Sequence, residues 1–136
     1  MIPVNVVAVL VATVVIFILG WLWYSPLLFF NPWMRARGMD PAAAMAGAKM
    51  PGMKLVLELI RCFVLSYVVA HFVVALAISG LFGAAHFALF LWLGLPVILL
   101  IGSVLWDNVP VKVATIHAGD WLVKLLAISL IVSRWG

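Results

Sequence analysis

The sequence predicts an all-α integral membrane protein with four transmembrane helices and a short interfacial helical segment between the first two. Of its 136 residues, 68% are hydrophobic and only 9% are charged, and the mean hydropathy is +1.33. A water-soluble domain must wrap its core in polar side chains, so this composition excludes one. Four apolar runs, at about residues 4–24, 55–79, 84–105 and 111–132, are each long enough to cross a bilayer. We expect them to form a single transmembrane helical-bundle domain over residues 1–136.

The first run is expected to be a retained membrane helix and not a cleaved signal peptide. No basic segment precedes it, and no small-residue cleavage site follows it. Trp21, Trp23 and Tyr24 come next, and such side chains are typical of a membrane interface. Pro26 then ends the helix, because its ring removes a backbone donor and clashes with the preceding turn.

The long connection at residues 25–54 is expected to carry two short helical pieces. Asn31 and Asp40 are each followed by a proline, which combines a capping side chain with a favourable first helical residue. The first piece is amphipathic. It should lie in the interface with its apolar side down and with Arg35 and Arg37 directed towards lipid phosphates.

Interfacial anchors are therefore predicted at the ends of the helices, where aromatic rings and arginines suit the headgroup region. The predicted anchors are Trp21, Trp23, Tyr24, Trp33, Arg35, Arg37, Trp106 and Trp135.

The third and fourth runs are separated by a tight loop. Pro96 lies inside the third run and is expected to bend it, because proline leaves a backbone carbonyl without its helical donor. The loop at residues 107–110 ends in a proline that can start the fourth helix.

The basic residues predict the orientation of the chain. Connections after the first and third runs hold five of the Lys and Arg side chains close to helix ends, whereas the opposite side holds one. The five are Arg35, Arg37, Lys49, Lys54 and Lys112, and the one is Arg134. By the positive-inside rule both connections are cytoplasmic and both termini lie outside the cytoplasm, in a multi-pass membrane protein.

The fourth run carries charged side chains where charge is expensive. His117, Asp120 and Lys124 fall within an arc of roughly 60° on a helix that turns about 100° per residue, so they share one face. A lone ionised side chain at the bilayer centre costs on the order of 3 kcal/mol. This intramembrane polar stripe must therefore face protein, water or another of its own members.

Three interpretations of the stripe remain open. Asp120 and Lys124 are spaced i, i+4 with the acid first, which favours an intrahelical ion pair that directs helix packing. Buried carboxylates and imidazoles also act as proton or ion relays in transporters. The third interpretation is a contact with another subunit or with a polar lipid headgroup.

The second run offers possible partners for this stripe. Glu58 and Arg61 are spaced i, i+3, which favours a local ion pair near the headgroups. An alternative is that the second and fourth helices are neighbours and that Arg61 also reaches Asp120 or His117 across the bundle, which would give a buried network. His71, farther along the second run, is another candidate for this network.

No pattern of metal ligands or catalytic residues emerges from the sequence. The three histidines lie on different elements, without the short spacings that metal sites use, so no metal site is predicted. Cys62, the single cysteine, is interpreted as a small hydrophobic side chain. Without a phosphate-binding glycine loop or a supported Ser-His-Asp arrangement, no catalytic residues and no enzyme are predicted. The sequence leaves any cofactor unknown.

Two stretches resemble a known family. The first is Gly20–Phe29, which reads GWLWYSPLLF and is followed by Trp33-Met34 and Gly38. The second is Gly102–Lys112, which reads GSVLWDNVPVK and is followed by Ile116–Gly119. Both resemble the ends of a family of small bacterial membrane proteins catalogued as domain of unknown function 1761. The resemblance implies a four-span bundle in a bacterial inner membrane and carries no catalytic role.

Two functions are compatible with this sequence. The first is a non-enzymatic accessory or assembly subunit of a homo-oligomer or larger inner-membrane complex, because intramembrane polar groups need a partner and little soluble surface exists. The alternative is a small proton- or cation-coupled transporter that uses Asp120. In both cases the partners are the lipid bilayer and other membrane subunits, and the basic residues are assigned to topology and lipid contact instead of nucleic acid.

Overall fold

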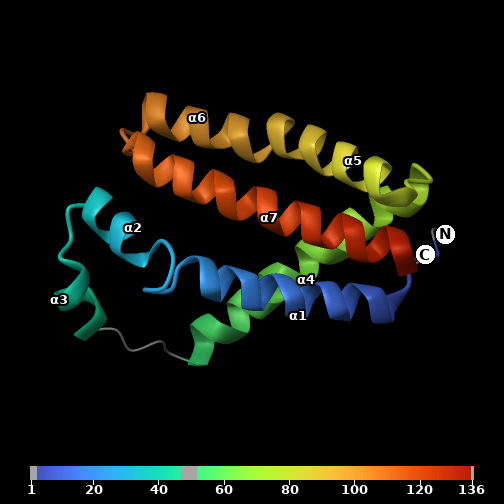
Figure 1. The fold of residues 1–136 in the computed structure, drawn as a ribbon, viewed down its shortest axis with the longest axis horizontal. Helices are drawn as coiled ribbons and strands as arrows, with labels where there is room; N and C mark the ends of the chain where they lie inside the picture. The colour runs from blue at the N-terminus through green and yellow to red at the C-terminus, as the bar shows by residue number, and fades with distance from the viewer. Residues whose placement is uncertain (1–2, 47–51, 136) are drawn as a thin grey trace.

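The structure is a computed structural model that describes residues 3–46 and 52–135 (Figure 1). In this part of the chain all regular structure is helical, and four helical segments are long and apolar enough to cross a membrane. These segments are α1 (Val6–Trp23), α4 (Gly52–Ala75), α5 with α6 (Gly80–Gly94 and Pro96–Trp106) and α7 (Val111–Trp135). The predicted all-α, four-span fold class is therefore confirmed.

Two short helices lie between the first two spans, α2 (Phe30–Ala36) and α3 (Pro41–Ala46). The helix α3 begins after Asp40, whose carboxylate accepts a hydrogen bond from the Ala42 amide at 3.3 Å. The cap-plus-proline start predicted there is thus present. The one predicted at Asn31 is wrong, because α2 begins at Phe30 and Asn31 lies inside the helix, which has no side-chain cap. Lys49, which contributed to the predicted orientation, lies outside the described residues, and the orientation itself stays a prediction.

The end of α4 differs from the sequence prediction. The run was expected to continue to residue 79, but α4 ends at Ala75. Ala77 adopts a left-handed backbone with φ of 52°. Its amide donates to Val74 O at 3.1 Å, and the Ile78 amide donates to Val73 O at 2.9 Å. This pair of bonds is a Schellman motif, which ends the helix without the glycine that usually marks one.

The third span is interrupted, as the proline predicted. Leu95, with φ of −117° and ψ of −80°, separates α5 from α6, and Pro96 is the first residue of α6. Proline suits that position because its missing N–H would lack a helical partner there. Figure 1 shows α5 and α6 following α7 as two segments of one long, bent span.

The last helix, α7, is the centre of the bundle. It packs against α1, α4, α5 and α6, and also contacts α2. The helix α4 packs mainly against α1 and α7, whereas α5 and α6 lie along α7. In Figure 1 both chain ends lie at one end of the bundle, and α2 and α3 lie at the other.

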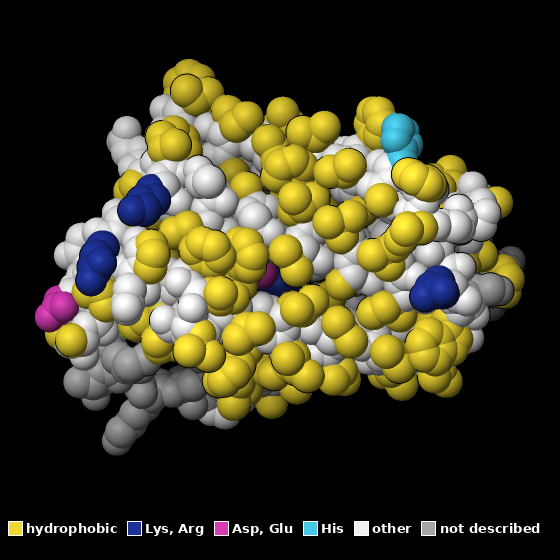
Figure 2. Space-filling view, in the orientation of Figure 1, with side chains coloured by type: hydrophobic (Ala, Val, Ile, Leu, Met, Phe, Trp, Pro, Cys, Tyr) yellow, Lys and Arg dark blue, Asp and Glu magenta, His cyan; other side chains and the backbone are white. Residues whose placement is uncertain are grey.

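The hydrophobic core lies between α1, α4, α5 and α7, mostly towards the end that holds the termini. Its buried members are Val9, Ala12, Ile16, Cys62, Val69, Ala70, Val73, Ala88, Leu125, Ile128 and Val132. The visible outer surface is largely apolar as well (Figure 2), as expected for a protein that faces lipid. The end of the bundle near α2 contains the polar side chains described below.

Candidate functional site

The polar stripe lies on the inward side of α7. Asp120 is 6% exposed and Lys124 is 9% exposed, whereas His117 is half-buried. Lys124 Nζ lies 3.0 Å from Asp120 Oδ2, which is the i, i+4 ion pair that the spacing favours. The two charges therefore neutralise each other inside the bundle, where neither is stable alone.

Space for the Lys124 side chain comes from a glycine on α1. A Cβ at Gly20 would lie 3.2 Å from Lys124 Cε and 3.4 Å from Lys124 Nζ. The first approach is closer than an ordinary van der Waals contact, and the second lies at its lower limit. The absence of a side chain at position 20 therefore lets α1 approach α7 directly over the ion pair.

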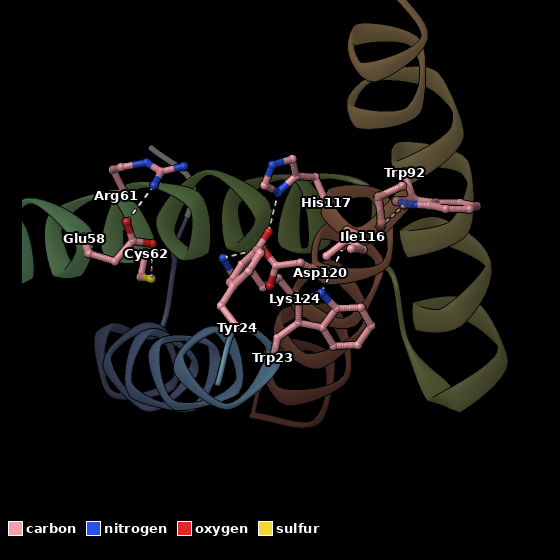
Figure 3. A network of polar contacts seen from close by, with 11 residues as sticks. Trp23, Tyr24, Glu58, Arg61, Cys62, Trp92, Ile116, His117, Asp120 and Lys124 are labelled. Carbon is pink, nitrogen blue, oxygen red and sulfur yellow. Dashed lines mark hydrogen bonds and ion pairs between the residues drawn. The ribbon is translucent and has the colours of Figure 1, made fainter. Parts of the chain in front are cut away.

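Tyr24, the residue that follows α1, joins the stripe into one network. Its hydroxyl lies 2.5 Å from His117 Nδ1 and donates to Asp120 Oδ2 at 3.4 Å. A hydroxyl has one proton, so while it donates to Asp120 it accepts from a protonated Nδ1 of His117. Figure 3 shows the resulting chain of polar contacts from His117 through Tyr24 and Asp120 to Lys124.

Two tryptophans bind the backbone of α7 from different spans. The Trp23 indole N–H donates to Ile116 O at 3.0 Å, and the Trp92 N–H donates to Ala118 O at 2.8 Å (Figure 3). In lipid an indole N–H has no water to bond, so a carbonyl partner within the bundle satisfies it. Both rings thereby hold α7 between α1 and α5.

The short helix α2 covers the polar network on its outer side. The Trp33 ring lies 4.8 Å from the Tyr24 ring and 6.1 Å from the His117 ring, between centroids. The Arg37 guanidinium carbon lies 5.1 Å from the Trp33 centroid, in a cation–π arrangement. An aromatic layer thus separates the network from the charged end of α2.

A second charged pair lies on α4. Arg61 Nη1 and Glu58 Oε2 are 2.6 Å apart, which is the local ion pair predicted from their spacing. Their side chains are 67% and 37% exposed, respectively. At 1.5 Å per residue Arg61 lies about 14 Å from the start of α4, whose full length is about 36 Å. The pair is therefore both exposed and well inside the span.

The alternative connection between Arg61 and the stripe is not found among the described residues. The hydrogen bonds and ion pairs of Arg61 in the described structure go to Glu58, and Figure 3 shows these two residues apart from the Tyr24 group. His71 is also separate, because its Nδ1 pairs with the Tyr67 carbonyl at 2.9 Å, one turn earlier on α4. The helices α4 and α7 are neighbours as supposed, but Arg61 faces outwards.

A cleft of about 400 Å³ between α4 and α7 lies beside both charged pairs. Apolar side chains form most of its walls, and Glu58, Arg61 and Lys124 supply the charged ones. The lining residues are Glu58, Ile60, Arg61, Cys62, Val64, Leu65, Val68, Trp121 and Lys124.

A second cleft, of about 490 Å³, lies along α6 and α7 and is almost entirely apolar. It contains Trp92, Thr115 and Gly119, but none of the charged residues. Across residues 3–46 and 52–135, no three His, Cys, Asp or Glu side chains come together as metal ligands would.

Tyr24 and Trp23 were assigned from the sequence only as interfacial anchors. The structure directs their polar atoms to α7, so both also belong to the site. Gly20 and Gly119, which let the helices approach, were not identified as site residues at all. The sequence could have pointed to these two glycines, since each lies in one of the two stretches that resemble the family.

Comparison with known proteins agrees with this resemblance. Residues 7–133 match a family model described as "Protein of unknown function (DUF1761)". Among curated proteins and solved structures, none matches the chain. Because the matched region covers nearly the whole bundle, from the first turns of α1 to the last turn of α7, the chain belongs to the DUF1761 family.

Proposed function

We propose that this protein is a non-enzymatic accessory or assembly subunit of a membrane complex, in which a partner covers the outward face of α4. The observation that carries the proposal is the Glu58–Arg61 ion pair, which is exposed on a helix that crosses the membrane. The buried network on α7 then has a structural role and holds α1 against the central helix.

Lipid chains are poor surroundings for the Glu58–Arg61 pair. One N–H of Arg61 donates to the Glu58 carboxylate. The other guanidinium N–H groups would find no acceptor among hydrocarbon chains. An arginine at the centre of a helix costs about 3 kcal/mol to insert, even on insertion scales. Arg61 lies about 4 Å short of the midpoint of α4 by helical rise.

A protein surface is a better cover than a lipid headgroup. The hydrocarbon core is about 30 Å thick, so headgroups lie roughly 15 Å from its centre, beyond the level of Arg61. A neighbouring subunit, by contrast, can bring carboxylates and carbonyls to any depth. The cleft beside the pair adds unfilled apolar surface for the same partner.

Removing the charged pair tests this proposal. We expect the wild-type chain to form a higher-mass species in nanodiscs taken directly from the native membrane, which retain any partner. The double variant Glu58→Leu, Arg61→Leu keeps an apolar helix and should lose that species. Lys54→Leu, on the exposed start of the same helix, should retain it. Native mass spectrometry measures the difference, and equal masses for wild type and double variant would contradict the proposal.

A second candidate function is a proton- or cation-coupled transporter that uses Asp120. The continuous contacts among His117, Tyr24, Asp120 and Lys124 favour it, because they lead from the α2 end towards the interior cleft. Proton movement in vesicles with imposed Na⁺ or K⁺ gradients tests it with a pH-sensitive dye. Asp120→Asn should abolish that movement and leave the assembly mass unchanged, whereas a wild-type chain that moves no protons overturns the candidate.

A further inference from the structure

We infer that the partner on α4 is a second copy of this chain, which packs α4 against α4 around a two-fold axis along the membrane normal. This inference rests on the proposed function, because it names the occupant of the same face. Three features of α4 carry it: the charges of the exposed pair, the spacing of the exposed residues and the position of the cleft.

The charged pair is self-complementary. In a two-fold interface the same surface meets itself, so a patch that carries one acid and one base can match its own copy. Glu58 and Arg61 are separated by about 4.5 Å along the helix axis, which an arginine side chain spans easily. Each Arg61 then lies between its own Glu58 and that of the second copy, and the four charges sum to zero.

Four of the exposed residues of α4 fit the spacing of a helix–helix seam. Leu57, Arg61, Val64 and Val68 are exposed and succeed one another at intervals of four, three and four residues. This is the a/d spacing by which two helices interlock side by side. Arg61 is the charged member of an otherwise apolar stretch, and a single polar residue in such a seam fixes the register of the two helices.

The cleft extends the same surface. Arg61, Val64 and Val68 belong to the seam and also line the cleft between α4 and α7. A second α4 along the seam therefore lies beside the cleft opening, where its apolar side chains reach Trp121. Lys124, at the bottom of the cleft, becomes more deeply covered by the same contact.

Exchanging charges between two tagged copies tests this inference. The Glu58→Arg variant carries two cations on this face of α4, and the Arg61→Glu variant carries two carboxylates there. Each should self-associate poorly, because like charges face each other across the axis. Co-expressed in one membrane, the two variants should co-purify at least about tenfold better than either like-charged pair, a gain of about 1.4 kcal/mol.

A charge-exchanged chain guards against variants that fail to fold. The single chain with both Glu58→Arg and Arg61→Glu keeps the net charge and the self-complementarity, so it should associate as wild type does. Failure of this chain to associate, or co-purification of the mixed variants no better than that of like-charged pairs, would overturn the second-copy inference.

The same experiment separates this inference from the proposed function. If the charge-exchange rescue fails while wild-type α4 cross-links to a different protein, the proposed function stands and the second copy is wrong. If wild-type chains are monomeric in the bilayer and α4 contacts no protein, both are wrong.

Discussion

Trp23 and Gly119 are in such close contact that a Cβ at position 119 would lie 2.5 Å from Trp23 Cζ2 and 2.9 Å from Cη2. The ring also donates to Ile116 O, so it cannot withdraw without losing that hydrogen bond. This contact joins the end of α1 to the middle of α7. It brings Tyr24, the next residue, to His117 and Asp120.

Gly119→Ala is therefore expected to destabilise the protein by about 1–3 kcal/mol, the usual range for overpacking. The matched control is Gly102→Ala on α6, where a Cβ would meet nothing within 4 Å. Unfolding of both variants in one detergent measures the difference. If the two alanines have equal effects, the contact between Trp23 and Gly119 is not as close as described.

Tyr24→Phe should weaken the packing of α1 on α7 by about 1–3 kcal/mol, because it leaves His117 Nδ1 without its partner and removes the hydrogen bond to Asp120 Oδ2. Tyr67→Phe removes a hydroxyl from an exposed position on α4 and is the matched control. Thermal melts followed by tryptophan fluorescence compare the two. A larger effect at Tyr67 would argue against the network.

Lys124→Met should be strongly destabilising, by about 3–5 kcal/mol, because it leaves the Asp120 carboxylate buried without its cation. Adding Asp120→Asn removes the uncompensated charge, so the double variant should be more stable than Lys124→Met alone. A thermodynamic cycle of chemical unfolding measures the coupling between these two side chains. Strictly additive effects would mean that the 3.0 Å pair contributes no interaction.

Most of the fold could be predicted from the sequence, because bilayer thickness sets the length of each apolar run. The helix break at Pro96 also followed from its missing donor. The end of α4 could not be predicted, because Ala77 adopts a left-handed backbone conformation that is usually found at glycine. When a residue other than glycine takes this conformation, no residue type in the sequence marks the end of the helix.

For the site, the sequence predicted only the contacts between side chains of the same helix. Spacing within α7 predicted the Asp120–Lys124 pair, since both residues lie on one element. Spacing within α4 likewise predicted that Glu58 would pair with Arg61. Contacts between two helices depend on how each helix is rotated about its own axis, and the spacing of residues along the chain does not define that rotation. For this reason the contribution of Tyr24 was missed, and the suggested link from Arg61 to the stripe was wrong.

The central claim is that protein covers the Arg61 face of α4, and site-specific photo-cross-linking in intact membranes tests it most directly. A benzophenone amino acid in place of Val64 should form protein adducts, because Val64 is exposed beside the Arg61 pair. The same group in place of Leu99, exposed on α6, is the matched control and should react mainly with lipid. Strong protein adducts at position 64 and few at position 99 are the predicted result. Absence of protein adducts at position 64, or equal yields at both positions, would contradict the account.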